Sequence, residues 1–365
     1  MSTPTDRMAP PAAHAEAAQP TQPAEQRRPQ MADLARLAGV SVATVSRALN
    51  GSTEVSEATR KRISELARQM NYTINLSAKN LRTRQNRTVA VVIPYDGSSR
   101  QHVSEPFFLT MMGSLADSLT SRGYDMLLSR VDAEKLDAAA ALYDSGTAIG
   151  IIMIGQWQQH DHLNRMAARN VPLVVWGAQL AQQLYCSVGG DNFDGGHKAT
   201  RHLIEQGRKR IAFLGDPDLP EVMLRHRGYE HALREAGMAP DPRLLLKQPF
   251  DANRASDAVR RLAADGVAFD ALFACSDVLA VAAIHALRSS GRAVPREVAV
   301  VGYDDVEWAR HAEPPLTTIR QPFANAGAEI VDALLQQLAG QKAAPRTLRV
   351  ELVVRNSSIA SGIER

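Results

Sequence analysis

Short apolar runs alternate with helical stretches from residue 88 to the end of the chain. The runs span residues 89–93, 126–128, 150–154, 173–176, 211–214, 271–274 and 298–301. Strands separated by helices of about 10 to 15 residues are typical of βαβ units, so this part is predicted to be α/β with parallel sheets. Because single cores stop growing at roughly 250 to 300 residues and the chain has 365, we expect a two-lobed body beside a smaller module.

Polar residues follow several of these apolar runs. Ligands of parallel sheets bind beyond the carboxyl ends of the strands, so these residues are candidates for a binding site. The segments are 94–96, 190–192, 215–216, 275–277 and 302–305. Each of them also fits a cap of the helix that follows, and for Asp216 and Asp277 capping is at least as good an interpretation.

The segment before the body has the spacing of three short helices. Met31, Leu34, Ala35 and Ala38 share one helical face, and Gly39 interrupts the pattern. Ser41 is a good cap for a second helix over 42–49, in which Val42, Val45 and Leu49 are expected inside. The side chains expected outside are those of Ala43, Thr44, Ser46, Arg47 and Asn50. Ser56 caps a third helix, and the pattern fits a helix-turn-helix or a generic helical hairpin equally well.

The charge is unevenly distributed along the chain. Residues 31–87 carry ten Lys or Arg side chains against four acidic ones, whereas residues 88–365 have a net charge of −3. A basic module on a mildly acidic body is typical of a chain that binds a polyanion with one part only.

Residues 1–30 are rich in Ala, Pro, Gln, Thr and Ser, which predicts a disordered tail and does not fit a signal peptide. No apolar run is long enough to span a membrane, so we expect a cytoplasmic protein. Cys186 and Cys275 are far apart and have no metal-ligand companions, so neither a metal nor another cofactor is expected. The nearest approach to a catalytic or metal motif is His160-Asp161-His162, whose spacing separates the two rings on a helix, so we expect no enzyme.

The residues from Ala32 to Gly51, followed by Val55-Ser56 and Asn71-Tyr72, closely resemble the headpiece signature of the lac-repressor family. The resemblance implies a helix-turn-helix that binds double-stranded operator DNA. It assigns base reading in the major groove to Val42, Ala43 and Arg47. It places Ser41, Thr44, Ser46 and Asn50 near the phosphates. An arginine fork pairs well with guanine, which agrees with the role implied for Arg47.

Residues 75–82 resemble the hinge helix of the same family. This implies that Ala78 and Leu81 contact the minor groove, with Leu81 as a wedge at the centre of a palindromic operator. Lys79-Asn80 stands where many relatives have Arg-Ser, which puts the flanking contacts in doubt. Pairing of two hinge helices implies a homodimer.

The body resembles the effector domain of the family, which is itself similar to periplasmic sugar-binding proteins. The motifs are 191–196, 224–229, 276–277, 301–305 and 314–319. The effector-binding residues that the resemblance implies are Phe107, Asp191, Arg225, Phe250, Ser276 and Asp304. Ser276 replaces an asparagine that many members have, and Trp176 fits either the cleft or simple sheet packing. The family pattern also returns residues 323–339 to the first lobe and 347–354 to the second.

The sequence therefore predicts four parts: a tail at 1–30, a helix-turn-helix domain at 31–74, a hinge helix and linker at 75–87, and a two-lobed effector-binding and dimerisation domain at 88–365. A regulator whose operator affinity depends on a small sugar is the main hypothesis. Control by a purine or by a phosphocarrier protein remains open. A periplasmic binding protein is excluded, because it would need a signal peptide and no DNA-binding head.

Overall fold

The computed structural model describes residues 30–49, 52, 54–70, 86–95 and 101–359. The chain forms two compact units, residues 1–84 and 85–365, and each is described by itself. Among the described residues, no helix has the length and apolar character needed to cross a membrane. The predicted hinge helix at 75–82 lies outside the described residues.

The first unit contains the three predicted helices: α1 (Met31–Ala38), α2 (Val42–Leu49) and α3 (Glu57–Gln69). Gly39 ends α1 in the left-handed conformation, with φ of 63°. The Ser41 hydroxyl accepts a hydrogen bond from the backbone N–H of Thr44 at 3.1 Å, and Ser56 accepts one from Thr59. Both predicted caps are therefore confirmed. A small core of eight buried side chains closes between the helices: Leu34, Ala35, Ala38, Val45, Ala48, Val55, Ile63 and Ala67.

Two residues of α2 face the opposite way from the prediction. Val42 was expected inside but is 47% exposed, because it occupies the first position of the helix, beyond the packed core. Ser46 was expected outside but is buried, since it lies on the arc of α2 that also carries Val45 and Ala48. The exposed face of α2 thus contains Val42, Ala43 and Arg47.

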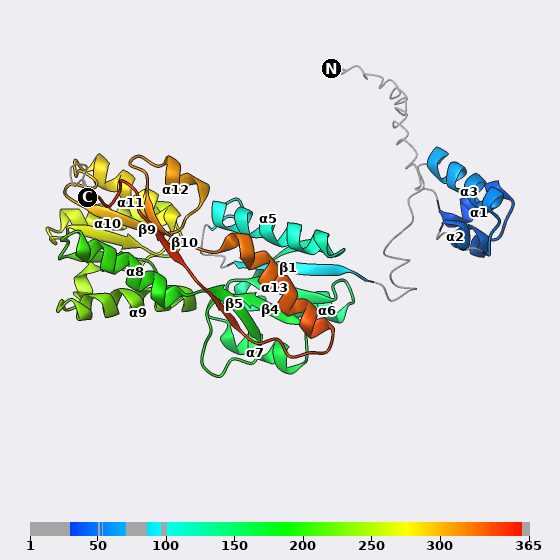
Figure 1. Ribbon diagram of the computed structural model, residues 1–365, viewed down its shortest axis with the longest axis horizontal. Coiled ribbons are helices and arrows are strands. Elements are labelled where there is room, and N and C mark those ends of the chain that lie inside the picture. The colour runs from blue at the N-terminus through cyan, green and yellow to red at the C-terminus, as the bar shows by residue number, and fades with distance from the viewer. Residues whose placement is uncertain (1–29, 50–51, 53, 71–85, 96–100, 360–365) are drawn as a thin grey trace, which may run out of the picture. The chain divides into compact units, whose positions relative to one another are not determined.

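The second unit is built on two six-stranded sheets, one in each lobe (Figure 1). The first sheet has the order β11-β5-β4-β3-β1-β2 and is parallel throughout. Its strands are β1 (Thr88–Tyr95), β2 (Asp125–Asp132), β3 (Gly150–Ile154), β4 (Leu173–Trp176), β5 (Cys186–Gly190) and β11 (Arg346–Leu348). The prediction of an α/β fold with parallel sheets is confirmed.

The second sheet has the order β12-β10-β9-β8-β6-β7, in which only the β10–β12 pair is antiparallel. Its strands are β6 (Ile211–Leu214), β7 (Leu245–Leu246), β8 (Ala271–Ala274), β9 (Ala299–Asp304), β10 (Thr317–Arg320) and β12 (Glu351–Val353). The central strands of both sheets are buried along their whole length, as expected for strands covered by helices on both faces.

Helices cover each sheet on both sides. In the first lobe, α5 (Pro106–Ser121) and α13 (Phe323–Leu338) pack together on one side of the sheet. The helices α6 (Asp137–Asp144) and α7 (His160–Ala168) contribute to the core on the other side of the same sheet. In the second lobe, α8 (Asn192–Glu205) and α9 (Pro220–Glu235) lie together below the sheet in Figure 1. The helices α10 (Ala252–Ala264), α11 (Asp277–Ser289) and α12 (Glu307–His311) lie above it.

The chain passes between the lobes three times: after β5, between β10 and α13, and between β11 and β12. Return of α13 to the first lobe agrees with the prediction. The prediction that residues 347–354 belong to the second lobe is wrong for Thr347 and Leu348. These two residues pair with Gly189 and Gly190 of β5, and only β12 belongs to the second sheet.

Two glycines let α8 and α9 touch backbone to backbone. A Cβ on Gly196 would overlap the carbonyl of Arg225, and one on Gly228 would overlap the carbonyl of Phe193. The helices therefore approach more closely than side chains would allow. This contact matters for function because α8 and α9 both carry residues of the cavity region described below.

We predict that Gly228→Ala destabilises the protein. The added methyl group has to push α8 away from α9, and overpacking of this kind costs about 1 to 3 kcal/mol of unfolding free energy. Chemical denaturation of the full chain measures the change. Gly113→Ala in α5 is the matched control: its Cβ meets open space, so the better helix former should raise stability by about 0.5 to 1 kcal/mol. Equal stability of wild type and Gly228→Ala would contradict the proposed close packing.

Candidate functional site

A cavity of about 730 Å³, including its open mouth, lies between the two lobes of the second unit. The first lobe contributes residues from the start of α5 and from the carboxyl ends of β3 and β4. The second contributes the start of α9, Phe250 two residues before α10, the start of α11 and the end of β9. The lining residues of the described chain are Gln101, Glu105, Phe107, Phe108, Ile154, Gly155, Trp157, Trp176, Leu219, Glu221, Arg225, Phe250, Ser276, Val278 and Asp304.

Five of the six residues expected in the effector site line this cavity: Phe107, Arg225, Phe250, Ser276 and Asp304. Asp191 is not among the described residues that line it. Its carboxylate caps α8 by accepting a hydrogen bond from the backbone N–H of Asp194 at 2.9 Å. A polar residue after a strand can serve either as a ligand-binding residue or as a helix cap, and Asp191 serves as a helix cap in the structure.

Arg225 is a buried cation held in a fixed plane. Its Nε donates to Oδ1 of Asn192 at 2.8 Å, and Nη1 donates to the carbonyl of Cys275. The guanidinium also lies over the ring of Tyr303, 3.7 Å from the centroid. These contacts come from α8, the end of β8 and β9, so the direction in which Arg225 meets the cavity is set by three elements of the second lobe.

Asp304 faces the same cavity at the end of β9 and is only 5% exposed. Its φ of 124° is strained for a residue other than glycine, and such strain is concentrated at functional sites. The next residue, Asp305, fixes the strained backbone, since its carboxylate accepts hydrogen bonds from Arg320 and Arg355. Gln321 donates to Oδ1 of Asp304 at 2.7 Å and orients the carboxyl group.

Burial raises the pKa of Asp304 to about 6, although the charge of Arg225 acts in the opposite direction. Two further carboxyl groups line the cavity, and burial raises the pKa of both Glu105 and Glu221. Glu105 accepts hydrogen bonds from Gln101 and from the backbone of His102. Glu221 accepts one from the backbone of Gln156 at 3.4 Å, a contact that joins the two lobes.

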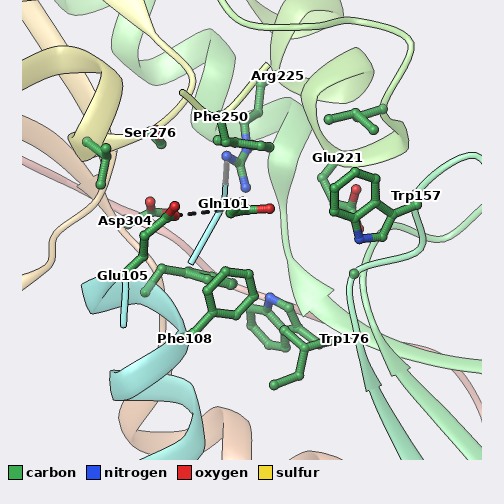
Figure 2. A pocket seen from close by; sticks show the side chains of 15 residues that line it. Gln101, Glu105, Phe108, Trp157, Trp176, Glu221, Arg225, Phe250, Ser276 and Asp304 are labelled. Carbon is green, nitrogen blue, oxygen red and sulfur yellow. Dashed lines mark hydrogen bonds between the residues drawn. The ribbon is translucent and has the colours of Figure 1, made fainter. Parts of the chain in front are cut away.

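Aromatic side chains form much of the remaining wall. Figure 2 shows Phe108 and Trp176 on one side of the cavity and Phe250 with Arg225 on the opposite side, whereas Trp157 lies beside Glu221 at one end. Trp176 is almost fully buried and still contributes to the lining. Flat apolar walls with a few fixed polar groups are typical of a site for a small cyclic ligand.

Four residues of the cavity were not predicted from the sequence: Gln101, Glu105, Trp157 and Glu221. Trp157 lies three residues after the end of β3, and this position beyond a strand end is the sequence signal for it. Glu105 and Glu221 have a different position: they stand at the beginning of α5 and α9, each next to a proline at the first turn. Their approach to the cavity depends on the packing of the lobes rather than on a local pattern.

The exposed face of α2 carries the side chains expected to read DNA. Val42, Ala43 and Arg47 are exposed, and Arg47 forms an ion pair with Glu54 at 3.2 Å in which both side chains are more than half exposed. Ser41 and Thr44 are hydrogen-bonded to each other at the beginning of the helix. Ser46 is buried, and its place near the phosphates stays a prediction. Asn50, Ala78 and Leu81 lie outside the described residues.

Both units match known protein families. Residues 30–75 match the bacterial regulatory proteins of the lacI family, and residues 200–358 match a periplasmic binding protein-like domain. The chain is 36% identical to the HTH-type transcriptional regulator CelR of Thermobifida fusca over 341 residues, which cover 91% of this chain and 98% of the relative. It is 31% identical to the HTH-type transcriptional repressor CytR of Escherichia coli, with 90% and 96% of the two chains covered.

Two solved structures share the fold. A complex of the regulator CelR with cellobiose matches with a TM-score of 0.68 and 33% identity, covering 90% of this chain and 100% of that one. A lac repressor dimer bound to operator and an anti-inducer matches with a TM-score of 0.80 and 26% identity, covering 92% and 100%.

These similarities extend over the helix-turn-helix and the two-lobed body alike, and the cavity lies where the resemblance implied an effector. The chain belongs to the lacI family of bacterial transcriptional regulators, which join a helix-turn-helix DNA-binding domain to a periplasmic-binding-protein-like domain.

Proposed function

We propose that this regulator is a cytoplasmic homodimeric repressor that binds a palindromic operator and responds to a neutral sugar of the disaccharide class. The observation that carries the proposal is the composition of the cavity, in which one fixed arginine and three carboxyl groups alternate with aromatic rings. Guanidinium and carboxylate groups each bind adjacent hydroxyls, while aromatic faces cover the apolar faces of sugar rings.

The charge of the cavity favours a neutral ligand. Among the described lining residues, Glu105, Glu221 and Asp304 face the same space as one cation, Arg225. A phosphorylated sugar or a nucleotide would bring further negative charge to buried carboxyl groups, which is unfavourable in a site of low polarity. Burial also raises the pKa of the three acids, so their own charged forms are already disfavoured there.

The placement of the polar groups favours a ligand longer than one ring. In Figure 2, Asp304, Glu105 and Ser276 lie at one end of the cavity, whereas Glu221 and Trp157 lie at the other. A molecule with hydroxyl groups at both ends would satisfy both sets. The similarity to the CelR–cellobiose complex supports this size class.

Thermal unfolding of the full chain in the presence of candidate ligands tests the proposal. A panel of cellobiose and other disaccharides, glucose, and purine bases covers the alternatives. A ligand at 100 times its dissociation constant stabilises a protein by about 2.7 kcal/mol, which is easily measured. Stabilisation by a purine base alone would replace the sugar hypothesis. If operator affinity changed only in the presence of a phosphocarrier protein, control by that protein would replace the sugar hypothesis.

The pH dependence of ligand binding gives a sharper prediction. Because the pKa of Asp304 is about 6 in the folded protein, its neutral form becomes dominant as the pH falls through 6. The ionised carboxylate accepts hydrogen bonds from sugar hydroxyls more strongly. If only the ionised form binds the sugar, the affinity for the sugar should fall about fourfold between pH 7.5 and pH 5.5. Calorimetry at the two pH values measures the change.

Asp304→Asn distinguishes the contribution of Asp304 to ligand binding from the contributions of the other acids of the cavity. It should weaken binding at pH 7.5 by about 10- to 150-fold, because a charge-assisted hydrogen bond is worth about 1.5 to 3 kcal/mol. It should also flatten the pH dependence, whereas Glu105→Gln should keep this dependence and move its midpoint to lower pH, because the charge of Glu105 contributes to the raised pKa of Asp304. An Asp304→Asn protein that keeps the full pH dependence would contradict the assignment.

For DNA recognition, we predict that Arg47→Ala weakens operator binding by about 5- to 150-fold while random DNA is bound nearly as before. The reason is that a bidentate contact to guanine is worth about 1 to 3 kcal/mol of discrimination. Lys61→Ala on α3 is the control for a purely electrostatic contribution and should affect both DNAs alike. Fluorescence anisotropy at two salt concentrations measures both effects. Equal losses on both DNAs for Arg47→Ala would remove it from base reading.

A further inference from the structure

Three side chains with metal-binding atoms converge on α8 and α9, outside the effector cavity. His197 comes from α8, and His231 and Glu235 come from α9. Nε2 of His197 lies 2.6 Å from Oε2 of Glu235, and Nε2 of His231 lies 3.2 Å from Oε1 of the same residue. The ligand atoms of all three side chains are within 4.8 Å of one another.

The convergence follows from the packing of the two helices, which lie side by side in Figure 1. The backbone contact at Gly196 and Gly228 brings the neighbouring His197 close to the surface of α9. His231 and Glu235 are four residues apart, so they share one face of α9. The rings of His197 and His231 then lie 5.5 Å apart between centroids.

The three side chains are accessible and partly ordered by their surroundings. His197 is the most covered, with 18% of its side chain exposed, whereas His231 and Glu235 are about half exposed at 50% and 53%. The ring of Phe193 lies 5.5 Å from that of His231 and limits its movement.

Cations near the cluster are already paired with acids, so they do not compete strongly for Glu235. The pairs are Lys198 with Asp194, Arg201 with Glu205, and Arg234 with Glu230.

We propose that His197, His231 and Glu235 form a binding site for a late first-row divalent cation such as Zn²⁺. Two imidazole nitrogens and one carboxylate oxygen are a donor set that zinc accepts, with metal–ligand distances of about 2.0 to 2.2 Å and an open fourth position. Two ligands at such distances in a tetrahedral centre are about 3.4 Å apart. The spacings of 2.6 and 3.2 Å between the histidines and Glu235 need only small side-chain shifts to reach this value, and the two histidine nitrogens, which lie within 4.8 Å of each other, have to reach it as well.

Calorimetric titration of ZnCl₂ into the full chain, without an affinity tag or chelator, tests the site. We expect the wild type to bind zinc and His231→Ala and Glu235→Gln each to weaken this binding by at least about tenfold. Loss of a residue that only supports a metal ligand already weakens metal affinity by about 10- to 100-fold. His311→Ala is the matched control. His311 also faces a glutamate four residues away, Glu307 at 3.2 Å, but is not in the three-ligand group found among the described residues.

Spectroscopy provides a readout that does not depend on stability. Co²⁺ in a four-coordinate site gives intense visible absorption, which His197→Ala should abolish and His311→Ala should leave unchanged. Thermal unfolding without metal shows whether each variant is folded. Absence of zinc binding by the wild type would overturn the proposal, and so would equal zinc affinity of wild type, His231→Ala and Glu235→Gln.

Discussion

The buried guanidinium of Arg225 connects the elements from which the cavity of this regulator is built. It joins the first residue of α8, the carboxyl end of β8 and the ring of Tyr303 on β9. A buried cation is stable only with such partners, and loss of one hydrogen bond to a charged group costs about 1.5 to 3 kcal/mol. The same charge opposes the effect of burial on the pKa of Asp304. The arrangement of the second lobe and the electrostatics of the ligand site therefore depend on one side chain.

Much of the architecture is visible in the sequence because local patterns specify it. The helices at 31–38 and 42–49 begin and end at the predicted residues, where Gly39 and Ser41 supply the stop and the cap. The strands β3, β4, β6 and β8 also coincide with their apolar runs, since buried parallel strands are apolar throughout. Strands without this composition were not predicted: β5 contains Ser187 and two glycines beside Cys186 and Val188, and β7, β11 and β12 have two or three residues each.

The candidate site was partly predictable for a different reason. Residues at strand ends, such as Asp304, can be located from the pattern of runs, and the family resemblance added Arg225 and Phe250. Glu105 and Glu221 reach the cavity only because the two lobes bring the beginnings of α5 and α9 together. Asp191 is not among the described lining residues for a local reason, because one carboxylate after a strand serves a helix cap as readily as a ligand. The orientation of Val42 and Ser46 depended on where α1 and α3 place the small core.

The three crossings between the lobes have a genetic consequence. Neither lobe corresponds to one continuous stretch of chain, because α13 and β11 complete the first sheet and β12 completes the second. A stop codon shortly after β10 would remove Ile330, Val331 and Leu334 from the core of the first lobe and the edge strand from the second. A simple truncation therefore cannot remove one lobe and leave the other intact. Recombination within the gene likewise has to preserve both lobes or damage both.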